Sequence, residues 1–184
     1  QHLHPDYQLC FNPIIADMIQ LENLYKSFGH TEVLRNISVF FEEKKTNLII
    51  GQSGSGKTVL LKCIIGLLSI DQGEILYDDI VFNKLNFKKK KEIRKNIGMV
   101  FQGGALFDSE TVEQNVKFPL DMFTDMTEEE KIHRVNECLE RVNIVNANQL
   151  YPAEISGGMQ KRVAIARAVV LNPKYLFFDE PISG

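Results

Sequence analysis

The stretch from Gly51 to Thr58 has the residue types and the spacing needed to hold a nucleoside triphosphate. A triphosphate carries several negative charges, so its site needs clustered backbone N–H groups, a helix N-terminus, a mobile cation and a magnesium ligand. The pattern G-x-x-x-x-G-K-[ST] supplies all four, with Lys57 reaching the β- and γ-phosphates and the Thr58 hydroxyl binding Mg²⁺. The predicted phosphate-binding residues are Gly51, Gln52, Ser53, Gly54, Ser55, Gly56, Lys57 and Thr58.

Two acidic residues, Asp179 and Glu180, follow the apolar run from Tyr175 to Phe178. In phosphate-loop nucleotidases the second magnesium element stands at the end of such a strand, so we expect Asp179 to hold Mg²⁺ through water. Glu180 is expected to orient and polarise the attacking water, because a general base must lie within hydrogen-bond reach of it. An acidic pair alone is often a solvated turn, and the upstream phosphate loop favours the site.

A further anion site is indicated at Ser156, where two glycines follow a small hydroxyl at the start of a predicted helix. Alone, such a segment is usually a turn or a cap. Together with the upstream phosphate loop and the downstream Asp179, the run Ile155–Gln160 resembles the signature of the ATP-binding cassette (ABC) family. That family usually has leucine where Ile155 stands, and often glutamine at Met159. The resemblance implies that these residues contact ATP: Ser156, Gly157, Gly158, Met159 and Gln160.

The same resemblance assigns roles to further residues. Signature residues of the family act on ATP held by a neighbouring subunit, which implies a homodimer and the cofactors ATP and Mg²⁺. Gln102 matches the family's glutamine loop, whose side chain meets Mg²⁺ and the attacking water. Phe28 lies where the family places an aromatic ring that stacks on adenine. Tyrosine is more usual at that position, and Tyr25 lies nearby.

Regular patterns predict the elements that position these residues. Residues 18–50 read as short strands with turns at 28–30 and 42–45, and the apolar run Leu48–Ile50 predicts a buried strand entering the phosphate loop. Apolar residues from Val59 to Leu68 recur at helical spacing. This strand–loop–helix context favours a phosphate site over a flexible glycine-serine loop. Residues 73–77 and 97–101 predict further short strands.

The chain between residues 105 and 160 is predicted to be mainly helical. Thr127 followed by Glu130 is a capping-box pattern, and apolar residues then repeat at spacings of three and four. A last helix is expected to start near Ser156 or Gly157 and to end before Asn172, since Pro173 disfavours a helical conformation in the residue before it. Residues 175–178 predict a central strand.

These elements and the resemblance give a fold class and a domain division. We expect an α/β P-loop NTPase (RecA-like) core with an antiparallel β lobe and an ABC helical subdomain at about 105–160. The ABC ATP-binding domain is expected to cover 18–184 and to be incomplete at the C-terminus, where the family's crossing loop and a histidine would follow. Residues 1–17 are interpreted as a non-native or read-through extension, and the fragment alone is expected to be inactive.

Composition narrows the function classes. The formal net charge is −3, which disfavours a general nucleic-acid binder, and the run Lys88–Lys91 is interpreted as a solvated helix face. Three cysteines lack the paired spacing of a disulfide framework or a zinc site, which suits a reducing cytosol. The longest apolar stretch, Val59–Ile70, is interrupted by Lys62 and falls short of a membrane span.

A stretch after the glutamine loop indicates a branch of the family. Phe101–Asp108 and Asn115–Leu120 resemble the ATPases of Mla-type phospholipid transporters. This implies an ATP-hydrolysing subunit on the cytoplasmic face of the inner membrane, paired with a permease and a lipid-binding envelope protein. Ala105, Leu106 and Phe107 are either permease contacts or buried within the helical lobe.

Other functions stay open at this point. An ABC ATPase for another substrate and a non-hydrolysing nucleotide-binding module both remain alternatives. ABC proteins of chromosomes or ribosomes are disfavoured, because the sequence shows neither sustained heptads nor a second cassette.

Overall fold

The computed structural model describes residues 18–42 and 44–179 of the chain. The expected extension at 1–17 and the residue Glu180 lie outside the described residues. In chain order the elements are β1 (Ile19–Phe28), β2 (Thr31–Phe41), α1 (Lys57–Ile64), β3 (Gln72–Tyr77), β4 (Ile80–Val81), the 3-10 turn η1 (Phe82–Lys84), α2 (Phe87–Arg94), β5 (Ile97–Val100), α3 (Val112–Phe123), α4 (Glu128–Arg141), the 3-10 turn η2 (Pro152–Glu154), α5 (Gly157–Val169) and β6 (Tyr175–Phe178).

An antiparallel sheet forms one lobe, as predicted. Its strand order is β2-β1-β3-β4, and Ile19 pairs with Phe41 on one side and with Tyr77 on the other. Gly29 makes the β1–β2 turn with a φ of 58°, a left-handed conformation that glycine adopts without steric cost. Apolar residues of this sheet pack against α1 in a buried β-lobe core: Ile19, Leu21, Leu24, Leu34, Leu60, Cys63, Ile64, Ile75, Tyr77 and Phe82.

The helix after the phosphate loop is shorter than its apolar periodicity suggests. It ends at Ile64, because Gly66 adopts a left-handed conformation with a φ of 76°. The Gly66 N–H donates to the Cys63 carbonyl (3.0 Å) and the Leu67 N–H to the Lys62 carbonyl (2.8 Å), the pairing of a Schellman cap. The Tyr77 hydroxyl also donates to the Ile64 carbonyl (3.0 Å), which fixes the last turn of α1 over the sheet.

A helical lobe is built from α3, α4 and α5. The predicted capping box of α4 is confirmed: Thr127 Oγ1 accepts from the Glu130 N–H, and the Glu130 carboxylate accepts from the Thr127 N–H. Thr111 and Gln114 form a second capping box at the start of α3. The facing sides of the three helices bury a helical-lobe core: Val112, Val116, Leu120, Val135, Cys138, Leu139, Ile144, Ala147, Ile155, Val163, Ala166 and Val170.

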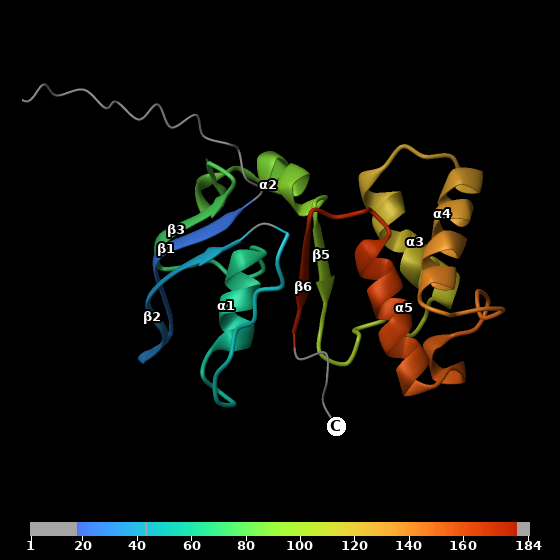
Figure 1. Ribbon diagram of the computed structural model, residues 1–184, viewed down its shortest axis with the longest axis horizontal. Coiled ribbons are helices and arrows are strands. Elements are labelled where there is room, and N and C mark those ends of the chain that lie inside the picture. Colours follow the sequence, from blue (N-terminus) through green and yellow to red (C-terminus); the bar gives the residue numbers. More distant parts are fainter. Residues whose placement is uncertain (1–17, 43, 180–184) are drawn as a thin grey trace, which may run out of the picture.

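Strands β5 and β6 lie between the two lobes, with α1 and the antiparallel sheet on one side and α3 to α5 on the other (Figure 1). The two strands run parallel, and Val100 is in register with Phe178. Helix α5 approaches β5 closely at Gly98, where an added Cβ atom would lie 2.3 Å from the Ala168 carbonyl oxygen. Glycine is therefore required at this crossing.

Two expectations about strands are wrong. Residues 48–50 form no strand, and Leu48 and Ile50 are 79% and 84% exposed. A buried strand needs neighbours for its backbone N–H and C=O groups, and no described strand pairs with this segment. Within the described residues β6 pairs with β5 alone, so Leu176 and Phe178 are exposed rather than central.

The lysine run behaves as expected. Lys88–Lys91 lie on α2, a helix with no buried residue. Cys63 and Cys138 are free and buried, one in each lobe core.

Asn115 is the polar residue that holds the loop before α3. It is fully buried; its Oδ1 accepts from the Phe107 N–H (2.8 Å), and its Nδ2 donates to the carbonyls of Phe107 (3.1 Å), Glu110 (3.0 Å) and Thr111 (3.0 Å). The Phe107 and Thr111 carbonyls also accept from the N–H groups of Glu110 (3.1 Å) and Asn115 (2.9 Å), so the Asn115 amide adds to the backbone bonds that hold this loop.

Asn115→Ala is therefore expected to lower the free energy of unfolding by about 3 kcal/mol, since the four hydrogen bonds of a buried amide are lost at once. Asn136→Ala is the matched control, because Asn136 is exposed on α4 and its loss is expected to cost less than about 0.5 kcal/mol. Urea unfolding followed by circular dichroism measures both. Equal losses for the two variants would contradict the role given to Asn115.

Candidate functional site

The phosphate loop has the backbone that an anion site needs. Gly54 and Gly56 adopt left-handed conformations with φ values of 77° and 94°, and the Ser55 N–H donates to the Gln52 carbonyl (3.2 Å). A Cβ atom on Gly51 would lie 2.6 Å from Ser55 Oγ. Gly56 is the N-cap of α1 and has no side chain to accept from the first-turn N–H groups. The loop therefore presents donors at a positive helix end, where a phosphate binds favourably.

Lys57 closes over this loop. Its Nζ donates to the carbonyls of Gly51 and Gln52, each at 2.9 Å. The side chain is half-buried. A cation held on two carbonyl oxygens at the rim of the loop is placed to exchange them for phosphate oxygens.

Two of the three predicted magnesium residues, Thr58 and Asp179, meet in the structure. Thr58 Oγ1 donates to Asp179 Oδ1 at 2.9 Å, although 121 positions separate them in the sequence. Asp179 is 7% exposed, and its N–H donates to the Val100 carbonyl (2.9 Å), which continues the β5–β6 register by one residue. A hydroxyl and a carboxylate oxygen at hydrogen-bond distance are ligands of the kind that Mg²⁺ takes.

This pair fits magnesium held jointly with a nucleotide. Within residues 18–42 and 44–179 no group of three or more His, Cys, Asp or Glu side chains could hold a metal ion. Mg²⁺ commonly uses one or two protein oxygens and completes its octahedron with water and substrate phosphates. Thr58 and Asp179 therefore suffice on the protein side.

The residues assigned by resemblance are exposed near the ends of two strands. Gln102 is exposed in the turn that follows β5. Phe28 ends β1, is 47% exposed, and has Lys26 Nζ 5.4 Å from its ring centroid. The hairpin after Phe28 also touches the loop, since a Cβ on Gly56 would lie 3.0 Å from Val33 Cγ1. The roles of Gln102 in catalysis and in binding Mg²⁺, and of Phe28 in base stacking, stay predictions.

The signature segment caps α5 and is exposed. Ser156 is the N-cap residue, and its Oγ accepts from the Met159 N–H (3.2 Å). Gly157 and Gly158 are exposed, and a Cβ on Gly157 would meet no atom within 4 Å. The Gln160 Nε2 donates to the Pro152 carbonyl (2.8 Å).

The start of α1, the carboxyl ends of β5 and β6, and the start of α5 lie at one end of the molecule, at the bottom of the view in Figure 1. No hydrogen bond joins residues 156–160 to residues 51–58 in the described part of the chain. The phosphate loop and the signature are thus separate surfaces on the same end.

Arg167 is a functional candidate that the sequence reasoning missed. From α5 it donates through Nη1 to the Ala105 carbonyl (2.9 Å) and through Nη2 to the Gly104 carbonyl (2.8 Å). Burial lowers the pKa of its guanidinium from the ordinary value. Only the fold brings this arginine to the loop after Gln102, so no local pattern in the sequence could reveal the contact.

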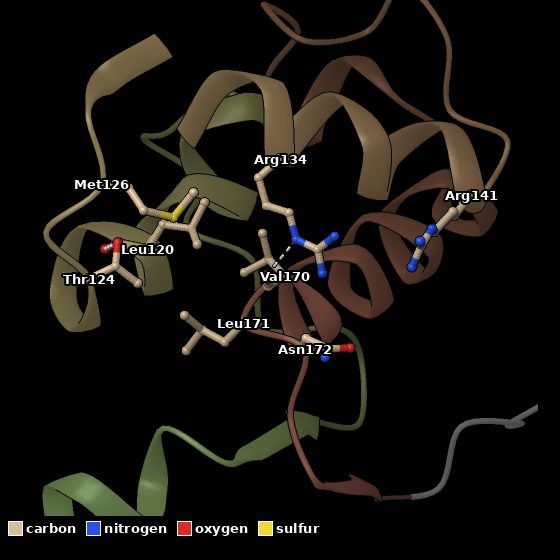
Figure 2. Close-up of a pocket in the computed structure, with 8 residues that line it drawn as sticks. All are labelled: Leu120, Thr124, Met126, Arg134, Arg141, Val170, Leu171 and Asn172. Carbon is tan, nitrogen blue, oxygen red and sulfur yellow. Dashed lines mark hydrogen bonds between the residues drawn. The ribbon is translucent and has the colours of Figure 1, made fainter. Parts of the chain in front are cut away.

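Two hollows lie away from the phosphate loop. A groove of about 380 Å³ separates β5 from α3 and the glutamine loop, and its lining includes Arg94, Phe101, Phe107, Phe118, Phe123 and Arg167. A hollow of about 460 Å³ lies near the end of α5, with Arg134 donating to the Val170 carbonyl at 2.9 Å (Figure 2). The second hollow contains none of the predicted nucleotide residues, and Arg134 there caps the end of α5.

Comparison with known proteins agrees with this geometry. The methionine import ATP-binding protein MetN of Clostridioides difficile (strain 630) is 42% identical over 167 residues, which are 91% of this chain and 52% of that protein. The phospholipid transport ATP-binding protein MlaF of Haemophilus influenzae is 40% identical over 91% of this chain and 64% of its own length. The glutamine transport ATP-binding protein GlnQ of Escherichia coli (strain K12) is 42% identical, over 91% and 69%. The chain thus spans about half the length of MetN.

Solved structures show the same fold. A dimeric ATP-binding cassette in a post-hydrolysis state, bound to ADP and phosphate, superposes with a TM-score of 0.81 at 34% identity, over 89% of this chain and 74% of that one. The cbiO1 protein of Clostridium perfringens, part of an ABC transporter complex, gives a TM-score of 0.79 at 31% identity, over 92% and 67%. These matches confirm the α/β P-loop NTPase fold.

A model of a whole protein family also matches the chain. The family model described as ABC transporter covers residues 34–183. This range includes the phosphate loop, the signature and Asp179. The chain therefore belongs to the ABC transporter family, as an ATP-binding domain.

Proposed function

We propose that this domain binds and hydrolyses ATP as one subunit of a dimeric ATPase that drives a membrane transporter. The observation that carries the proposal is the hydrogen bond between Thr58 Oγ1 and Asp179 Oδ1 (2.9 Å) beside the Lys57 ammonium. It gathers a hydroxyl, a carboxylate and a cation at the end of a glycine loop, which is what a magnesium triphosphate needs.

The residues divide the chemistry among them. The loop N–H groups and Lys57 bind the phosphates, and Thr58 and Asp179 hold Mg²⁺, which neutralises charge on the transferring phosphoryl group. Glu180 orients the attacking water and accepts its proton, and Gln102 holds that water in line. Most of the catalysis is positioning, because phosphoryl transfer leaves the protein little covalent work.

The exposed signature supports a dimer. Ser156 and the two glycines present a helix N-terminus to solvent, whereas their own chain's phosphate loop forms no hydrogen bond with them in the described residues. We infer that they contact ATP on a second subunit. A related cassette is dimeric with ADP and phosphate bound.

The groove beside the glutamine loop supports a membrane partner. Aromatic rings line it; Phe107 and Phe118 meet edge to face at 4.9 Å between centroids, and both are 42% exposed. At its edge Arg94 Nε is buried and has no hydrogen-bond partner among the described residues. An amphipathic helix from a permease would cover the exposed faces of these rings. Phe107 is then a contact residue, while Leu106 packs partly into the helical lobe.

The proposed location follows from that partner. No helix in residues 18–42 and 44–179 combines the length and the apolar character that crossing a bilayer requires. We propose that the protein is peripheral on the cytoplasmic face of the inner membrane and is held there by the permease.

The identity of the transported substrate is a more specific proposal than the ATPase activity. The stretch Gly103–Phe107 favours phospholipid, with a lipid-binding envelope protein as a further partner, and MlaF is among the relatives. Relatives of similar identity are named for methionine import and for glutamine transport, so amino acids are the competing cargo class.

Lys57→Ala is expected to weaken ATP binding at least about tenfold in the complete protein, because a charge-assisted contact to the phosphates is lost. Lys62→Ala, on the same helix, is expected to change the affinity by less than about twofold. Isothermal titration with ATP and Mg²⁺ measures both. Unchanged affinity in Lys57→Ala would show that the loop does not bind the phosphates.

Glu180→Gln is expected to keep ATP binding, to slow hydrolysis by roughly a hundredfold or more, and to trap a closed dimer. Glu140→Gln, an isosteric change on the exposed face of α4, is the control and should hydrolyse ATP normally. Phosphate release and size-exclusion chromatography with ATP give the readouts. Normal turnover in Glu180→Gln would remove it from the mechanism, and no turnover in the unmodified complete protein would favour a non-hydrolysing module.

Purification of the complete protein with its membrane partner is expected to recover phospholipid above the level retained by an unrelated permease in the same detergent. Mass spectrometry of the extracted lipids gives the measurement. A partner that binds an amino acid, with ATP hydrolysis stimulated by that amino acid, would defeat the lipid proposal and leave the ATPase proposal intact.

A further inference from the structure

Arg167 connects the helix that begins at the signature to the loop that carries Gln102. Its two Nη atoms donate to the carbonyls of Gly104 and Ala105, at 2.8 and 2.9 Å. Its guanidinium carbon lies 5.7 Å from the centroid of the Phe107 ring. A planar fork with fixed donors holds two neighbouring carbonyls better than a lysine could.

The held loop has a backbone that needs support. Gly103, Gly104 and Ala105 have φ values of 75°, 81° and 46°, all in the left-handed region. Ala105 has a Cβ atom, so this conformation is unfavourable for it without contacts from outside the loop. Within the described residues, one turn bond, from the Gly104 N–H to the Phe101 carbonyl (2.9 Å), lies inside the segment. The contacts from Arg167 therefore hold residues 104 and 105 from outside the loop.

The other end of this restraint is rigid. Helix α5 buries Val163, Ala166 and Val170 in the helical-lobe core, and Ser156 caps its first turn. Gly104 also lies against α5, since a Cβ on it would be 3.4 Å from Ala164 Cβ. A displacement of α5 must therefore carry the loop with it.

We propose that Arg167 is a positioning residue that makes Gln102 and the signature Ser156 move as one unit. The inference rests on the proposed function, in which Gln102 serves the ATP of its own subunit and Ser156 serves the ATP of the partner. Gln102 then reaches the ATP of its own subunit only when α5 of that subunit has brought Ser156 to the ATP of the partner. The Phe107 ring extends the same unit to the groove proposed for the permease.

The test compares Arg167→Gln with Arg162→Gln in the complete protein. Arg162 lies on the same helix and also donates to two carbonyls, those of Val142 (3.3 Å) and Asn143 (3.0 Å), away from the glutamine loop. Arg167→Gln is expected to lower kcat for ATP hydrolysis at least about tenfold with the KM for ATP changed less than about twofold, because the phosphate loop is untouched. Arg162→Gln should leave both constants within about twofold. Arg167→Lys keeps the charge and should recover part of kcat.

A double-mutant cycle separates positioning from general damage to the fold. In a Gln102→Ala background, Arg167→Gln should lower kcat by less than about twofold, since its effect passes through the missing side chain. A merely structural role would lower kcat by the same factor in both backgrounds, and that result would overturn the proposal. Equal losses in Arg167→Gln and Arg162→Gln would overturn it as well.

Amide hydrogen exchange gives a readout that does not depend on hydrolysis. The Gly104 N–H, which donates to the Phe101 carbonyl, should exchange at least about tenfold faster in Arg167→Gln than in the unmodified protein, and at the unmodified rate in Arg162→Gln. Absence of hydrolysis in the unmodified protein would count against the proposed function, and the exchange rate would still decide whether Arg167 restrains the loop. Unchanged exchange at Gly104 would overturn the inference.

Discussion

The hydrogen bond from Thr58 to Asp179 joins the start of α1 to the end of β6, and the packing around it serves to keep those two oxygens together. Helix α1 is fixed from its far end by the Tyr77 hydroxyl, which donates to its last turn. Asp179 is fixed by its own N–H, which extends the β5–β6 ladder to the Val100 carbonyl. A nearly buried carboxylate is costly without partners, so the site depends on both anchors holding at once. The positions of the loop glycines and of Lys57 then depend only on the local conformation of the phosphate loop.

Local signals explain most of what the sequence predicts correctly. The capping box at Thr127 and the apolar spacing after it lie within one helix, so they define α4 without knowledge of its neighbours. The spacing from Gly51 to Thr58 is equally local, and it identifies the phosphate loop. Helix α1 shows where local signals compete: the apolar residues continue to Leu68, but Gly66 ends the helix, because its left-handed cap satisfies the last carbonyls.

The failures all involve partners distant in sequence. The apolar run Leu48–Ile50 looks like a buried strand, yet burial depends on which strands pair beside it, and no described strand does. The same limit hides Arg167, because an arginine that folds back onto a loop has the same neighbours in sequence as one that faces water. The sequence predicts that Thr58 and Asp179 each serve Mg²⁺, but their hydrogen bond at 2.9 Å is a property of the fold.

The close approach of α5 to β5 at Gly98 has a mechanical consequence. The buried cluster at this contact consists of Val100, Ala164 and Ala168, and Leu106 and Ile165 pack partly against it. Two of its three buried side chains are alanines, so sliding along this seam disrupts less packing than sliding within either lobe core, which would force many rotamer changes. Shear of the helical lobe against the strands is therefore expected to follow this seam.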